Sequence, residues 1–72
     1  MASKVSIRLG KRIRSQRLAK GWRQIDLAQH SGIREVHLSY LERGLREVGL
    51  NTLVAIANAL DITLSELFRD IE

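Results

Sequence analysis

Apolar residues in the first third of the chain recur every four positions. Val5, Leu9 and Ile13 form one apolar stripe with basic residues around it, which is the pattern of an amphipathic helix. The stripe predicts a helix from about residue 5 to residue 20. Gly21 is placed to end this helix, because glycine readily adopts the left-handed conformation found after helices.

The rest of the chain predicts shorter helices separated by glycines or polar turns. Apolar residues at helical spacing predict helices over residues 24–30, 34–43 and 50–60. The last of these is marked by Leu50, Leu53, Ile56, Ala57 and Leu60. Residues 63–66, Thr-Leu-Ser-Glu, form a capping-box pattern that begins a fifth helix, which buries Leu64 and Leu67. No segment shows sustained alternation of apolar and polar residues, so the predicted fold class is all-α.

Residues 24–43, QIDLAQHSGIREVHLSYLER, hold two helices of about two turns each. Gly32 stands in the turn between them, where a positive φ is needed. Four apolar residues face inward, and their spacing fixes the two helices near a right angle. They are Leu27, Ile33, Leu38 and Leu41. This is the helix-turn-helix pattern. An ordinary corner of two helices that binds no DNA fits the same pattern.

Length and composition exclude several classes of protein. Seventy-two residues predict a single domain over residues 1–72, and the absence of cysteine excludes disulfides and thiolate metal sites. No apolar stretch approaches the ~20 residues that span a membrane, and residues 1–12 lack the apolar region of a secretory signal. We therefore expect a soluble cytoplasmic protein that does not span a membrane.

No catalytic arrangement stands out along the chain. His30 and His37 lie seven residues apart with no suitable third ligand, so a metal site is not expected. Neither histidine is paired with a plausible nucleophile, and no glycine-rich phosphate loop follows a strand. We expect a protein that is not an enzyme and that needs no cofactor or small-molecule ligand.

The basic residues are concentrated at one end of the chain. Residues 1–23 carry eight Lys and Arg and no acid, whereas residues 24–72 carry four basic and eight acidic residues. Such an asymmetry favours a polyanionic partner, either nucleic acid or an anionic membrane surface. A solvated basic helix without any partner is the competing interpretation.

Five blocks of the sequence, taken together in this order, resemble the XRE/Cro/C1-type helix-turn-helix regulators. These blocks are LGKRIRSQR at 9–17, GWRQIDLA at 21–28, SGI at 31–33, LSYLERG at 38–44 and LNTLVAIANALDITLSELF at 50–68. Within this family, the short chain with Arg46 after the second motif helix is similar to the controller proteins of restriction–modification systems.

The resemblance implies a five-helix, lambda-repressor-like DNA-binding domain whose motif spans about 24–43. It also implies a sequence-specific transcriptional regulator that acts as a homodimer on double-stranded DNA with a two-fold operator. The alternative is an antitoxin-type module that binds a protein partner and represses its own operon. Such antitoxins usually carry an extra toxin-binding segment, whereas almost nothing in this sequence lies outside the five expected helices, so the regulator is favoured. A membrane-surface role for the basic first helix ranks third, so no membrane partner is expected.

Two roles come from the family pattern. Arg17 and Glu42 are implied to form a structural ion pair behind the recognition helix, although each alone would pass for a surface charge. Gln24 is implied to bind a phosphate together with the amino end of its helix, although it is also an ordinary first-turn residue. The family usually has Ser or Thr where Arg23 stands. Arginine cannot cap a helix by accepting a hydrogen bond, so this helix start is either poorly capped or uses another device.

Only the outward and amino-terminal positions of the second motif helix can reach base edges. Arg34 suits guanine, Val36 suits the thymine methyl, and Glu35 either accepts from cytosine or complements the helix dipole. The expected base-reading set is Arg34, Glu35, Val36, His37 and Tyr40, and the resemblance to the family supports all of these except His37. The expected phosphate contacts are Arg23, Gln24, Ser39, Arg43 and Arg46, although in controller-like members of the family the loop that carries Arg46 can also approach bases.

The carboxyl-terminal part carries more apolar residues than one small core can hide. The residues left over once the inward positions are filled are Val54, Leu64, Phe68 and Ile71. An exposed apolar patch of this kind marks an interface, so we expect residues of the dimerisation helices, about 50–71, to meet across a two-fold axis.

Overall fold

The computed structural model describes residues 3–69 and 71, and within them it contains five helices and no strand. The helices are α1 (Lys4–Ala19), α2 (Gln24–Ser31), α3 (Glu35–Glu42), α4 (Leu50–Leu60) and α5 (Leu64–Leu67). The all-α, five-helix fold is therefore confirmed. The bounds of α4 agree with the prediction, and those of α2 and α3 differ from it by one residue.

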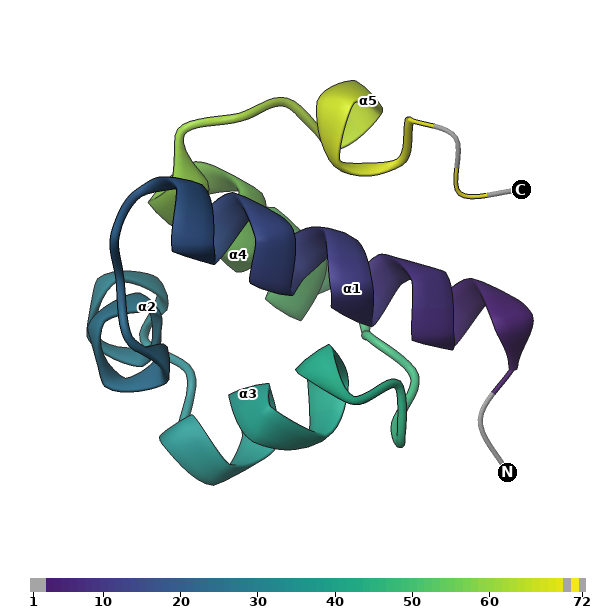
Figure 1. Cartoon of the computed structure of the whole chain (residues 1–72), viewed down its shortest axis with the longest axis horizontal. Coiled ribbons are helices and arrows are strands. Elements are labelled where there is room, and N and C mark those ends of the chain that lie inside the picture. Colours follow the sequence, from purple (N-terminus) through teal and green to yellow (C-terminus); the bar gives the residue numbers. More distant parts are fainter. Residues whose placement is uncertain (1–2, 70, 72) are drawn as a thin grey trace.

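Helix α1 lies at the centre of the molecule. It packs against α3 on one side and against α5 on the other, with α4 behind it (Figure 1). Helix α2 closes one end by packing against α3 and α4. None of the described helices is long and apolar enough to cross a membrane. The arrangement leaves the outer side of α3 uncovered at one edge of the molecule (Figure 1).

The core draws on all five helices. Its buried apolar residues among those described are Leu9, Ile13, Leu27, Ala28, Leu38, Leu41, Leu53, Ile56, Ala57, Leu60, Leu67 and Ile71. Two residues of the apolar patterns that predict helices lie outside the core, because Val5 is exposed and Leu50 is 71% exposed. A step of four residues overshoots one helical turn by about 40°. The buried face of α1 therefore runs through Ser6, Leu9 and Ile13 and leaves Val5 outside.

Ile71 corrects a second expectation. It was predicted to be left over for an interface, yet it is only 6% exposed and belongs to the core. The chain turns after α5, where the N–H of Ile71 donates to the carbonyl of Phe68 (3.2 Å). The guanidinium of Arg8 in α1 donates to the carbonyl of Ile71 (3.4 Å). This turn carries the residue back over the core, which its apolar character alone did not indicate.

Gly10 allows α1 and α3 to approach closely. A Cβ atom at this position would lie 2.4 Å from the carbonyl oxygen of Leu41 and 2.6 Å from that of Glu42. Both atoms belong to the backbone of the last turn of α3, so they cannot move aside like the end of a side chain. Glycine inside a helix costs about 1 kcal/mol relative to alanine. Here it permits the contact that holds the second motif helix against the body of the molecule.

Candidate nucleic-acid interface

Helices α2 and α3 form the helix-turn-helix that the sequence predicts. Gly32 ends α2 with φ 74° and ψ 15°, which is the left-handed conformation. Its N–H donates to the carbonyl of Ala28 (2.9 Å), and the N–H of Ile33 donates to the same carbonyl (3.2 Å). Leu27 and Leu38 close the inner side of the turn and are fully buried. The motif is thereby held to the core from within.

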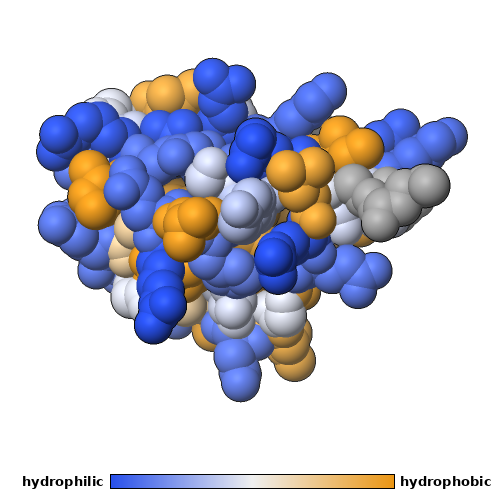
Figure 2. Space-filling model, turned by 90° about the horizontal axis from the view of Figure 1, so that it is seen from below, coloured by the Kyte–Doolittle hydropathy of each residue, from blue (hydrophilic) through white to orange (hydrophobic). Residues whose placement is uncertain are grey.

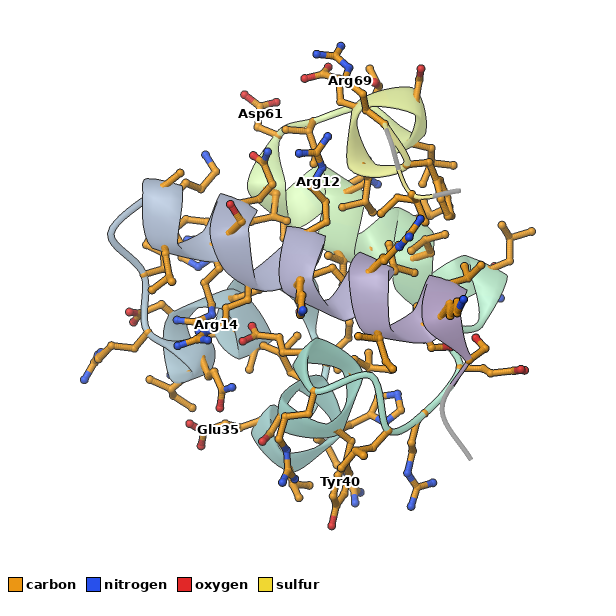
Figure 3. All side chains as sticks on the ribbon, turned by 45° about the vertical axis from the view of Figure 1, so that its right-hand side comes forward. Arg12, Arg14, Glu35, Tyr40, Asp61 and Arg69 are labelled. Atoms are coloured by element: carbon orange, nitrogen blue, oxygen red, sulfur yellow. The ribbon has the colours of Figure 1, made fainter. Side chains whose placement is uncertain are left out.

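The outer side of α3 is polar and open to solvent. Arg34, Glu35 and Val36 are exposed at its amino end, and Val36 is 59% exposed even though it is apolar. Figure 2 shows the molecule from this side, where hydrophilic residues dominate and apolar ones are scattered. In Figure 3, Glu35 and Tyr40 project away from the body of the molecule. These side chains are placed to meet a partner without unfolding anything.

The remaining predicted base and phosphate contacts on α3 are less open. His37, Ser39 and Tyr40 are half-buried. Arg34 is the residue before the first turn of α3, with an extended backbone (φ −63°, ψ 140°), and its side chain makes no capping hydrogen bond. Its guanidinium is therefore available beside the positive end of the helix.

Two arginines at the carboxyl end of α3 lie against one aromatic ring. The guanidinium carbon of Arg43 is 5.3 Å from the centre of the Tyr40 ring, and that of Arg46 is 5.1 Å from it. Both distances fall within the range of cation–π attraction. The sequence prediction assigned the arginines to phosphates and Tyr40 to bases. It did not bring the three side chains together.

Arg23 stands immediately before α2, as predicted, and its side chain does not cap the helix. Asp26 supplies the other device, since its carboxylate accepts a hydrogen bond from the backbone N–H of Arg23 (2.8 Å). The same carboxylate accepts from the Arg23 guanidinium (Nη2–Oδ1 3.1 Å), which lowers the pKa of Asp26 and raises that of Arg23. The sequence contained a signal for this cap, because an acid three residues after the cap position is half of a capping box.

Arg17 and Glu42 lie behind α3 and are brought together by the fold. Arg17 Nε donates to Glu42 Oε2 (2.7 Å), and Arg17 Nη2 donates to Oε1 (2.9 Å). The third guanidinium nitrogen, Nη1, donates to the backbone carbonyl of Trp22 (2.7 Å). Both side chains are almost completely buried. The pair links the last turn of α1 to the last turn of α3 with two parallel charge-assisted hydrogen bonds.

Gln24 belongs to the same network, which the sequence prediction did not anticipate. Its amide nitrogen donates to Glu42 Oε1 (3.2 Å) from the first turn of α2. One of the two amide N–H groups is engaged in this way, so the side chain is oriented by the ion pair. The pair therefore positions the amino end of α2 as well as the back of α3.

The predicted interface residues of α4 and α5 are partly uncovered, except for Ile71. Val54 and Phe68 are exposed, and Leu64 is half-buried. Leu50 lies one turn before Val54 on α4, and its exposure adds it to this apolar surface. The sequence pattern marks Leu50 as part of this helix but does not predict it at the interface.

The two histidines take part in no metal cluster among the described residues. The ring of His30 stacks on Trp22 with 4.3 Å between ring centroids, and its Nδ1 lies 2.8 Å from the carbonyl of Asp26. These contacts give His30 a structural place at the end of α2.

Residues 13–67 match the family described as Helix-turn-helix. Control protein C.MunI from a Mycoplasma species is 40% identical over 73 residues, which cover 94% of this chain and 93% of that protein. The uncharacterized HTH-type transcriptional regulator y4dL of Sinorhizobium fredii is 40% identical over 52 residues, or 72% of this chain. This chain covers 26% of the length of that regulator.

A crystal structure of the restriction-modification controller protein C.AhdI from Aeromonas hydrophila has a similar fold. It superimposes with a TM-score of 0.84 and 42% sequence identity, covering 86% of this chain and 94% of that chain. The similarity thus extends over both the motif and the helices packed around it.

Proposed function

Because this chain belongs to the XRE-type helix-turn-helix family of transcription regulators and is of the controller-protein type, we propose that it binds a two-fold operator as a homodimer. The observation that carries the proposal is the contrast between the two sides of α3. Its inner side is closed by Leu38, Leu41 and Glu42, whereas its amino-terminal outer side is exposed. A helix held in this way can enter the major groove without rearrangement. The role is one of regulation by binding, not catalysis.

The amino end of α3 reads the bases. Arg34 pairs with guanine O6 and N7, Glu35 accepts from cytosine N4, and Val36 contacts a thymine methyl. His37 reaches a neighbouring base from the next position along the helix. The fifth candidate, Tyr40, is less free because its ring already contacts two arginines.

Phosphate contacts flank the recognition helix at both ends. Arg23 and Gln24 stand at the amino end of α2, and Ser39, Arg43 and Arg46 stand along and after α3. Such contacts set the register of the protein on the duplex and carry no sequence information themselves. The hydrogen bond from Gln24 to Glu42 supports this role, because it orients the amide before DNA arrives.

The homodimer forms through α4 and α5, with Val54, Leu64, Phe68 and the newly identified Leu50 at the two-fold axis. Their partial exposure on one chain supports this interface. A two-fold dimer would hold two recognition helices about 34 Å apart, one turn of DNA. Sedimentation at micromolar concentration should give a dimer that Val54→Asp dissociates, and a monomeric parent protein would refute it.

Selection of bound DNA from a random pool tests the function directly. We expect enrichment of a two-fold sequence, and each true base contact should contribute roughly 1–3 kcal/mol of discrimination. Arg34→Ala and Val36→Ala should then relax the preference at single, different positions. The matched control is Arg43→Ala, which should weaken all sequences alike and lower the salt slope by about one unit. A pool without enrichment would instead favour a module that acts by binding another protein.

A further inference from the structure

Tyr40 contacts both arginines that follow the recognition helix, and this arrangement depends on the backbone after α3. The N–H of Leu45 donates to the carbonyl of Tyr40 (3.0 Å), which folds the chain back over the last turn of the helix. Gly44 makes the turn with φ +71°. A Cβ there would lie 2.6 Å from the Cα of Ile7, so the turn is held against α1. The turn returns Arg46 to the ring that Arg43 already contacts.

The ring brings together two like charges. Neither of the ion pairs found among the described residues includes Arg43 or Arg46, so no carboxylate there neutralises them. The faces of an aromatic ring carry negative potential, which attracts each guanidinium and offsets their mutual repulsion. Tyr40 is half-buried, so the surrounding protein restricts the position of its ring. The ring therefore limits the conformations of two long, flexible side chains.

We propose that Tyr40 is a positioning residue, which preorganises Arg43 and Arg46 for the DNA backbone and does not itself read sequence. The inference rests on the proposed function, since it assigns how two phosphate contacts are made ready. Long side chains lose rotamer freedom when they bind, and a side chain already restricted loses less. Removing the ring should weaken binding to every sequence in the same proportion.

Two substitutions separate the ring from its hydroxyl. Tyr40→Phe keeps the ring, and we expect its affinity to stay within about twofold of the parent protein. Tyr40→Leu removes the ring but keeps an apolar side chain, and we expect roughly tenfold weaker binding on specific and random DNA alike, the factor expected when two long side chains must be ordered on binding. In a background that already carries Arg43→Ala and Arg46→Ala, Tyr40→Leu should cause no further loss.

Nuclear magnetic resonance of the free protein provides a readout that does not depend on DNA. The side-chain signals of Arg43 and Arg46 should show ring-current shifts that persist in Tyr40→Phe and vanish in Tyr40→Leu. Unshifted signals in the parent protein would overturn the stacking, whether or not DNA binds. A change in the preferred base with Tyr40→Phe would overturn the assignment in favour of base reading by the hydroxyl. A parent protein that shifts as expected but binds no DNA would overturn the proposed function and the positioning role with it.

Discussion

Two ion pairs flank the helix-turn-helix, and the same chemistry has different consequences in each. Arg17 and Glu42 meet at 2.7 Å with side chains that are 8% and 2% exposed. Arg23 and Asp26 meet at 3.1 Å with side chains that are 79% and 26% exposed. The first pair joins α1 to α3, whereas the second lies within three residues at the start of α2.

The two pairs differ in whether water can take the place of a lost partner. At the buried pair, all three guanidinium nitrogens of Arg17 have partners, and Gln24 also donates to the carboxylate. Loss of one partner there leaves a charge without solvent or a counter-charge. At the exposed pair, water and salt take over when a partner is lost, so little stability depends on it. The buried pair therefore holds the motif in place, while the exposed pair adjusts one helix end.

The largest effect is expected from Glu42→Ala. Breaking a buried pair costs about 3–5 kcal/mol, which is a large share of the 5–15 kcal/mol typical of a whole domain. Fold and DNA binding should be lost together. Denaturant unfolding measures the loss, with Arg23→Ala as the matched control, because it breaks the exposed pair and keeps the hydrogen bond from the residue 23 backbone N–H to Asp26. An unchanged unfolding midpoint in Glu42→Ala would show that the two pairs do not differ as described.

A smaller loss is expected from Gly10→Ala, which tests the backbone contact beside the buried pair. In an uncrowded helix this change stabilises by about 1 kcal/mol, but here the new Cβ meets the backbone of α3. Overpacking of this kind costs roughly 1–3 kcal/mol, so the net change should be destabilising. Gly49→Ser is the control, because nothing lies within 4 Å of a Cβ at Gly49. A more stable Gly10→Ala protein would contradict the close approach of α1 and α3.

The smallest effect is expected at the exposed pair, and it depends on pH. The hydrogen bond from Arg23 holds the pKa of Asp26 below its ordinary value of about 3.9. A carboxyl group whose pKa is lowered by folding contributes stability above that ordinary value, and the contribution is lost as the pH falls through the folded pKa.

Asp26→Asn keeps a cap that can accept a hydrogen bond but removes the charge. The parent protein should therefore melt slightly above this variant at neutral pH, and the two should converge as the pH falls below about 4. Thermal melts over a pH series measure the difference. Identical melting temperatures at every pH would show that the exposed pair contributes nothing to stability.

Much of the fold could be predicted because its signals are local. The helices, the left-handed Gly32 and the capping box at Thr63 depend on residues within a turn of one another, and each is found as expected. The pairing of Arg17 with Glu42 is different, because the residues lie 25 positions apart. The resemblance to a family implies this ion pair, whereas the spacing of the two residues alone does not.

The tertiary structure decided which faces are covered and which distant groups meet. Leu50 and Ile71 are both apolar, yet one is left in solvent and the other is returned to the core by a turn. The packing of α3 against Gly10 is what distinguishes this glycine from the others, and the turn at Gly44 is what brings Arg46 to the Tyr40 ring that Arg43 already contacts. The sequence determined the helices and the motif, because periodicity depends on near neighbours. Burial and side-chain partners depend on how the helices are placed in space, which no local pattern records.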